Sequence, residues 1–279
     1  MPACFFASDL HGRTDRYDKL IGAIARERPA AVFLGGDLLP HALAAADFLD
    51  GYLVPQLERL RTAVGTGYPR VFLILGNDDP RSEEGAVEEA GRRGLWEYAH
   101  QRRLAWGARD VWGYACVPPT PFSLKDWERY DVSRHLEPGC IPPEEGWHTV
   151  AVPERELRYR TIREDLERLA GDADLSRSVF LFHAPPYHSA LDRAGLDGRS
   201  VDHAPVDVHV GSIAVRQFIE ARQPLVTLHG HVHESARLTG RWREQIGRTH
   251  VFSAAHDGPE LALIRFDPDD LARATRDLL

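Results

Sequence analysis

Short apolar runs alternate with helically patterned stretches along the first third of the chain. Strands are predicted at 3–7, 31–34 and 71–75, and helices at 16–27 and 41–64. The apolar runs are four or five residues long, which suits strands that are buried on both faces. Strands that alternate with helices indicate βαβ units and a largely parallel sheet.

The last third of the chain returns to this pattern after an irregular middle. Strands are predicted at 178–182, 225–228, 249–254 and 261–266, and helices at 155–170 and 213–222. The middle contains five of the six tryptophans and many prolines, with one strand predicted at 112–117. Its aromatic content favours an ordered cap or rim over a disordered loop. We therefore expect a single domain over 1–279 with an aromatic and proline-rich insertion at about 83–152.

Five short polar blocks each follow a predicted strand. They are Ser8-Asp9-Leu10-His11-Gly12, Gly35-Gly36-Asp37, Gly76-Asn77-Asp78-Asp79, Phe182-His183-Ala184 and Leu228-His229-Gly230-His231-Val232-His233. The loops at the carboxyl ends of the strands of an α/β sheet converge on a binding site. Any one block can arise by chance, but five in order, each at a strand end, indicate one shared site.

The residue types in these blocks are those that divalent metals select. Carboxylates and imidazoles together suit Mn, Fe or Zn, and an asparagine carbonyl oxygen adds a neutral ligand. In Asp9-x-His11, two side chains from one turn can reach the same ion. His231 and His233 are two apart on an extended segment, so they point the same way and can straddle two metals.

The series Asp9-x-His11, Gly36-Asp37, Gly76-Asn77, His183 and Gly230-His231-x-His233 resembles the calcineurin-like metallophosphoesterase superfamily. The resemblance covers almost the whole chain apart from the aromatic middle. It implies an α/β fold, a four-layer αββα sandwich with two central mixed β-sheets. It also implies two divalent metal ions, for which Mn, Fe, Zn or Ni are candidates and Mn or an Fe/Mn pair is favoured.

The resemblance also assigns roles to individual residues. Asp9, His11 and His233 would hold the first metal, Asn77, His183 and His231 the second, and Asp37 would bridge them. The implied activity is that of a dinuclear-metal-dependent phosphoester hydrolase, either a phosphodiesterase or a phosphatase. A metal-bridging hydroxide would attack phosphorus in line with the leaving group, because two cations acidify the water and clamp the phosphoryl oxygens.

Asp78 departs from the family pattern, in which a histidine often follows the asparagine and helps to neutralise the phosphoryl group or protonate the leaving oxygen. A carboxylate repels phosphate unless it is protonated or paired, so Asp78 cannot simply replace that imidazole. This departure favours a good leaving group or another proton donor. His188, His203 and His209 are candidates for the donor, and we favour His209.

Three further features remain open between a functional and a structural interpretation. Arg13 is a candidate for contact with substrate phosphate, or it is a solvated residue at a helix start. Asp79 either supports a metal ligand or caps the helix that begins near Arg81. The segment 118–127 either lines a substrate pocket or is a packed structural loop.

The composition limits the possible binding partners and the cellular compartment of the protein. The formal net charge of −8, without a clear basic run, favours a small phosphorylated substrate and gives no indication of nucleic acid. Cys4, Cys116 and Cys140 show no paired spacing and suit reduced thiols in the cytoplasm. No apolar run reaches the roughly 18 residues that span a bilayer, and no signal peptide is evident.

Two competing functions remain at this stage. A non-catalytic metal-binding scaffold of the same fold would use the metal-site face to bind a protein partner. A mononuclear metal hydrolase would hold one ion rather than two. The sequence selects neither a natural substrate nor an oligomeric state.

Overall fold

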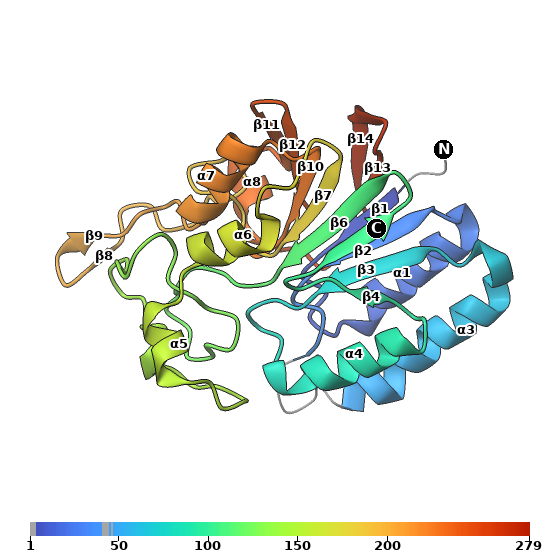
Figure 1. Cartoon of the computed structure of the whole chain (residues 1–279), viewed down its shortest axis with the longest axis horizontal. Helices are drawn as coiled ribbons and strands as arrows, with labels where there is room; N and C mark the ends of the chain where they lie inside the picture. Colours follow the sequence, from blue (N-terminus) through green and yellow to red (C-terminus); the bar gives the residue numbers. More distant parts are fainter. Residues whose placement is uncertain (1–3, 41–44, 46) are drawn as a thin grey trace.

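Two six-stranded β-sheets pack face to face and carry helices on their outer sides (Figure 1). The computed structural model describes residues 4–40, 45 and 47–279. The four layers follow the order helix, sheet, sheet, helix, and both sheets contain parallel and antiparallel pairs. The predicted four-layer αββα sandwich with two mixed sheets is confirmed.

The first sheet has the strand order β14-β13-β1-β2-β3-β4. Its strands are β1 (Cys4–Ala7), β2 (Ala31–Gly35), β3 (Arg70–Ile74), β4 (Glu97–Tyr98), β13 (Ala262–Asp267) and β14 (Asp270–Leu278). Strands β1 to β4 run parallel, whereas β13 is antiparallel to β1 and β14 is antiparallel to β13. The parallel strands therefore all end at one edge of the sheet.

The second sheet has the strand order β11-β12-β10-β7-β6-β5. Its strands are β5 (Arg103–Trp106), β6 (Arg109–Tyr114), β7 (Ser178–Phe182), β10 (Val226–His229), β11 (Arg243–Ile246) and β12 (Thr249–Ser253). The four central strands are parallel, and the two outer ones, β5 and β11, are antiparallel to their neighbours.

Helices cover the outer face of each sheet (Figure 1). On the first sheet they are α1 (Thr14–Glu27), α3 (Val54–Val64) and α4 (Glu84–Arg92), and on the second α6 (Ile162–Ala170) and α7 (Ile213–Arg222). A π-helical turn at Leu49–Leu53 leads directly into α3. The predicted helix 41–64 thus ends at Val64 as expected, while residues 41–44 and 46 lie outside the described residues.

Aromatic rings from both sheets meet in the central layer. Trp106 of β5 lies with its ring centroid 5.5 Å from that of Phe33 on β2 and 6.2 Å from that of Phe72 on β3. At the other side of the layer, the rings of Phe252 on β12 and Phe266 on β13 are 6.1 Å apart. Burial of these apolar surfaces joins the two sheets and fixes how their strand ends face each other.

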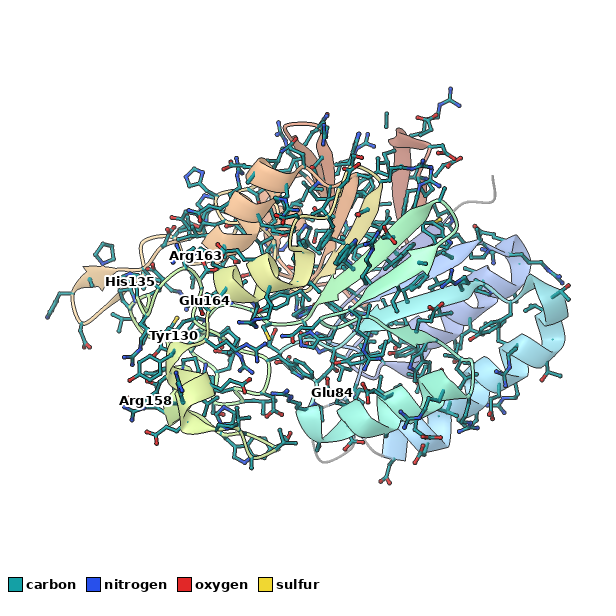
Figure 2. The ribbon with its side chains drawn as sticks, viewed as in Figure 1. Glu84, Tyr130, His135, Arg158, Arg163 and Glu164 are labelled. Atoms are coloured by element: carbon teal, nitrogen blue, oxygen red, sulfur yellow. The ribbon has the colours of Figure 1, made fainter. Side chains whose placement is uncertain are left out.

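The predicted helix 155–170 is wrong as one element, because it divides into α5 (Glu154–Tyr159) and α6. Thr161 has an extended backbone, and its hydroxyl accepts a hydrogen bond from the Glu164 backbone N–H. Glu164 lies in the first turn of α6 (Figure 2). The Glu164 carboxylate in turn accepts from the Thr161 N–H at 3.4 Å. This capping box starts a new helix where the apolar spacing predicted continuity.

The strand predicted at 112–117 is displaced and spans Arg109–Tyr114 as β6. Arg109 and Asp110 are polar, so the apolar pattern did not reveal the start of the strand. The segment 83–152, expected as an insertion, first supplies α4, β4, β5 and β6, and so contributes to both sheets. The irregular part begins after Tyr114 and is anchored by the buried side chains of Trp127 and Tyr130.

We predict that Trp106→Ala lowers the free energy of unfolding by about 3 kcal/mol, because it removes the ring that joins β2 and β3 to the second sheet. Denaturant unfolding of the metal-free protein measures the change. Trp147, which is 54% exposed, is the matched control, and Trp147→Ala should cost less than about 1 kcal/mol. Equal losses in the two variants would contradict the assigned packing.

Candidate metal centre

Five loops meet at the carboxyl ends of β1, β2, β3, β7 and β10. The loops are joined by backbone hydrogen bonds: Asp9 N–H donates to Gly36 O at 3.0 Å, and His11 N–H donates to Asp37 O at 2.8 Å. In the second sheet, Gly230 N–H donates to His183 O at 3.0 Å. The packing of the two sheets therefore brings both sets of loops to one seam.

Four of the side chains expected to bind metal form a tight cluster. Asp9, His11, Asp37 and His233 each place one ligand atom within 4.8 Å of the others. The Nε2 atoms of His11 and His233 are 3.2 Å apart, and His233 Nε2 is 3.3 Å from Asp9 Oδ1. Asp9 and Asp37 are buried, whereas the two histidines are partly accessible.

A second group adjoins the first through Asp37. His183 Nε2 lies 3.1 Å from Asp37 Oδ2 and 3.0 Å from Asn77 Oδ1. The Asn77 amide donates through Nδ2 to Asp78 Oδ1 at 3.0 Å, which turns its oxygen toward His183. The His231 ring lies 5.2 Å from the His183 ring, centroid to centroid. Asp37 thus stands between two groups of potential ligands.

The donor set fits a divalent metal. His183 Nδ1 is 2.8 Å from Gly35 O, and because a carbonyl only accepts, the hydrogen of the neutral ring lies on Nδ1. Its Nε2 lone pair then faces two oxygen atoms, those of Asp37 and Asn77. Such converging acceptors are matched either by a proton on Nε2 or by a metal cation, and carboxylate, imidazole and amide oxygen suit Mn, Fe or Zn.

The pKa values of two buried histidines also indicate that the site favours positive charge. Burial disfavours the charged imidazole of His183, but the Asp37 carboxylate outweighs it and raises the His183 pKa to about 10. Burial is likewise outweighed at His233, whose bond to Asp9 raises its pKa to about 9. At His231, burial and the nearby His183 outweigh the Asp37 and Asp9 carboxylates and lower its pKa to about 3.

The ligand loops adopt backbone conformations that few residue types tolerate. Asp9, His11, Asp37 and His231 have φ values of 56°, 47°, 51° and 74°. Such left-handed conformations cost about 1–3 kcal/mol each for a side chain other than glycine, and Asp and His are among the types enriched there. A Cβ on Gly36 would lie 2.6 Å from His183 Nδ1, so glycine is required at this position.

Asp79 supports the ligand loops and does not cap the following helix. Its buried carboxylate accepts backbone N–H bonds from Gly76 at 2.8 Å, Leu38 at 3.1 Å and Leu39 at 2.7 Å. It therefore ties the Asp37 loop to the Asn77 loop. The N–H of Arg81, at the start of the next helical turn, donates instead to Asp126 at 2.8 Å.

Two supporting side chains were not anticipated from the sequence. The Ser8 hydroxyl donates to Asp9 Oδ2. The buried Arg16 guanidinium donates to Asp9 O at 2.5 Å and to Gly258 O at 2.6 Å. Ser8 adjoins a predicted ligand, which was the available signal. Arg16 lies in α1 with an ordinary helical pattern, and its spacing carried no signal.

The three other predicted residues occupy different surroundings. Asp78 lies beside the cluster, with Oδ2 3.7 Å from His11 Nδ1, and its N–H donates to Asp37 Oδ1 at 2.8 Å. His209 Nδ1 is 2.8 Å from Oδ1 of Asp192, which is fully buried. The exposed Arg13 pairs with Asp15 at 3.2 Å.

The fold and this site together define an α/β sandwich whose seam gathers candidate metal ligands. The family model described as calcineurin-like phosphoesterase matches residues 4–235, and the chain belongs to this family. The family supports a hydrolase that uses metal.

Solved structures share the fold. A protein from Thermus thermophilus has a TM-score of 0.55 and 17% identity, over 99% of this chain and 98% of its own. A dimetal phosphatase from Danio rerio has a TM-score of 0.53 and 14% identity, over 95% and 92% of the two chains. Comparison with curated proteins finds no match. Among the helices within 4–40, 45 and 47–279, none is long and apolar enough to cross a membrane.

We predict that metal uptake releases protons. The raised pKa values mean that His183 and His233 are protonated in the metal-free protein at neutral pH, and a metal must displace those protons. Affinity for Mn²⁺ should therefore rise between pH 7 and 9, with about one to two protons released on loading. Calorimetry in two buffers of different ionisation enthalpy measures the number released.

The same shifts predict the pH dependence of the metal-free protein. Because the His183 pKa is raised from 6.5 to about 10, the stability it contributes is fully present below pH 6.5 and is lost as the pH rises through about 10. Metal uptake without proton release, together with flat stability over this range, would contradict the assignment.

Proposed function

We propose that this protein is a dinuclear-metal-dependent phosphoester hydrolase, a phosphodiesterase or phosphatase. The observation that carries the proposal is the place of Asp37, whose carboxylate adjoins both the cluster with Asp9 and the group around His183. A carboxylate shared between two ligand groups is an arrangement that suits a pair of divalent ions.

The ligands divide into two sets in this proposal. Asp9, His11 and His233 would hold one ion, Asn77, His183 and His231 would hold the other, and Asp37 would be shared by both. Two cations held there would supply an acidified water as nucleophile and positive charge for the phosphoryl oxygens. Manganese or an iron–manganese pair suits the mixed carboxylate and imidazole donors.

The chain itself would orient the ligands and manage protons. Asp79 fixes the Asp37 loop and Arg16 fixes the Asp9 loop through hydrogen bonds to backbone atoms. The two ligand carboxylates therefore would not have to move when metal binds. We assign the donation of a proton to the leaving group to His209. Its Nδ1–H faces the buried Asp192, which fixes the tautomer and leaves Nε2 as the exchanging atom. We retain Arg13 as a phosphate contact once it leaves Asp15.

A small phosphorylated molecule is the proposed substrate, because the net charge of −8 and the absence of a clear basic run disfavour a polyanion. The Danio rerio neighbour is named a dimetal phosphatase, which agrees with this class. Cys4, Cys116 and Cys140 are unpaired, in keeping with a cytoplasmic location. A non-catalytic scaffold would tolerate the loss of ligands, and all seven predicted ligands are present.

We predict that Asp37→Asn lowers hydrolysis of a chromogenic phosphodiester with Mn²⁺ by about a thousandfold or more and weakens metal binding, since it removes the shared anion. The wild-type protein should hold two metal equivalents by elemental analysis. Asp172→Asn, an exposed aspartate, is the control and should retain both metals and turnover.

The outcomes separate the three candidate functions. Two bound metals without hydrolysis of any mono- or diester would favour the scaffold. One tightly held ion would favour a mononuclear hydrolase. Wild-type turnover in Asp37→Asn would show that the bridge is wrongly assigned.

We also predict that Asp78→His preserves or raises turnover on esters with poor leaving groups. The change replaces a carboxylate beside His11 with a group that can neutralise or protonate the phosphoryl oxygens. Comparison of kcat for a nitrophenyl ester and an alkyl ester measures the effect. A sharp loss on both esters would mean that Asp78 itself has a positive role.

A further inference from the structure

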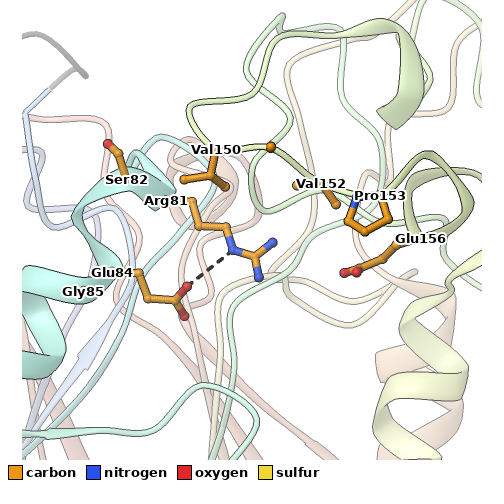
Figure 3. A pocket seen from close by; sticks show the side chains of 9 residues that line it. Arg81, Ser82, Glu84, Gly85, Val150, Val152, Pro153 and Glu156 are labelled. Atoms are coloured by element: carbon orange, nitrogen blue, oxygen red, sulfur yellow. Dashed lines mark hydrogen bonds and ion pairs between the residues drawn. The ribbon is translucent and has the colours of Figure 1, made fainter.

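Two adjoining cavities lie beside the metal-ligand loop 76–79. One has a volume of about 250 Å³ and is lined by residues that include Arg81, Tyr98, His100, Arg102, Arg129 and Arg160. The other, of about 340 Å³, has an apolar side formed by Val150, Val152 and Pro153 (Figure 3). Arg81 and Glu84 line both cavities, which therefore adjoin each other and are together termed the recess.

The topology places this recess next to the metal centre but outside it. Strand β4 lies beside β3, and β6 lies beside β7, at the same edge that carries Asn77 and His183. Tyr98 ends β4, and Cys116 follows the end of β6, and both line the smaller cavity. Adjacent strands are about 4.8 Å apart, so the cavity opens one strand outward from the ligands.

Arg81 offers unused donors to the recess. Within the described chain, its side chain commits only Nε to an acceptor, the Glu84 carboxylate, at the long distance of 3.4 Å. Figure 3 shows its terminal nitrogens pointing away from Glu84, toward the side on which Glu156 lies. The guanidinium stacks over Trp127, with 5.4 Å between its carbon and the ring centroid, so the group is held in place.

Arg129 is a second donor that protein groups do not saturate. Its side chain is only 4% exposed, and its terminal nitrogens donate to Glu128 O and to Glu156 Oε1, each at 2.9 Å. Its buried Nε has no partner in the part of the chain that the structure describes. A buried guanidinium nitrogen without an acceptor is unfavourable, and an anion in the adjoining cavity would relieve it.

His100 adds a neutral donor to the same wall. Its Nδ1 accepts a hydrogen bond from the Ala115 N–H at 2.9 Å, so the ring hydrogen lies on Nε2. Burial, together with the surrounding arginines, holds the His100 pKa well below its usual value, and the ring stays neutral. No residue within the described ranges accepts a hydrogen bond from this Nε2–H.

Arginines outnumber carboxylates among the residues that line the smaller cavity. Glu84 is the one carboxylate that lines the smaller cavity, against four arginines. Glu156 Oε1 serves both Arg129 and Arg160, while Asp165 pairs with Arg160 and Glu88 with Arg102. Acidic partners therefore hold the guanidiniums in position, and several of their N–H groups remain available to a ligand.

We propose that this recess is a second anion site, which binds the phosphate group of a small molecule between Arg81, Arg129 and His100. The smaller cavity has room for a phosphate group, and the larger cavity, with its apolar side, can accept the rest of the molecule. Guanidinium forks match phosphate geometry and are the usual protein partners of such a group. The site is independent of the catalytic proposal, because none of its residues is a predicted metal ligand.

One hydrogen bond connects the site to the metal loop. Trp127 lines the polar cavity and donates from Nε1 to Asp79 O at 2.8 Å. The Asp79 carboxylate in turn holds the loops of Asp37 and Asn77 together. A ligand that contacts Arg81 would therefore also order the stacked Trp127 and, through it, the metal-ligand loop.

We predict that Arg81→Gln weakens phosphate binding at this site by about tenfold or more, because it removes a charge-assisted contact. Calorimetric titration of the Mn²⁺-loaded protein with inorganic phosphate measures it, and Glu84→Gln should strengthen binding. Arg92→Gln, an exposed arginine of α4 paired with Glu89, is the matched control and should bind as wild type does. The wild type and all three variants keep every predicted metal ligand. Any phosphate that binds at the metal centre therefore contributes equally to each titration.

A crystal soak locates the ion independently of the titration. Selenate should give an anomalous peak within hydrogen-bonding distance of Arg81 and Arg129. Identical phosphate affinities in wild type and Arg81→Gln, or a selenate peak confined to the metal centre, would overturn the proposal. Failure of the metal centre to hydrolyse esters would leave this result untouched, so the two proposals fail separately.

Discussion

The arrangement of the site depends on the Asp37 carboxylate at the seam between the two sheets. One of its oxygens faces His183 from the second sheet, and the other accepts the Asp78 N–H from the first. This meeting occurs because the aromatic layer around Trp106 fixes the sheets face to face. Packing in the core thus determines how closely the two groups of ligands approach each other. The cost of burying a carboxylate at the seam is offset only when positive charge lies beside it.

The fold followed from the sequence where burial was strong. Strands such as β7 and β2, apolar on both faces, were predicted within a residue of their bounds. The edge strands β5, β11 and β14 were missed, because exposed residues recur along each of them and leave no continuous apolar run. The end of one helix and the start of the next were also missed at Thr161, where a side-chain cap begins α6 although the apolar pattern continues. Local hydrogen bonds of this kind leave no mark on hydrophobic periodicity.

The site was predictable to the extent that its residues follow strand ends. Asp9, His11, Asp37 and His233 were named from short motifs, and the structure gathers these four within reach of one ion. The support from Arg16 and Trp127 was not predictable, because each side chain reaches a metal loop through a backbone carbonyl that no sequence motif marks. Such contacts depend on the tertiary path of the chain and not on spacing. The recess around Arg81 escaped notice for the same reason, since its arginines come from four separate segments.

The left-handed backbone at Asp9, His11, Asp37 and His231 limits which amino acids can replace them. A glutamate carries the same charge as Asp37 but has a longer chain, and it is not among the types enriched in this conformation. Asparagine tolerates the geometry but lacks the charge. Each position therefore requires a side chain that can bind metal and a residue type that tolerates a left-handed backbone. Few residue types meet both requirements. Substitution at these loops is constrained even before any reaction is considered.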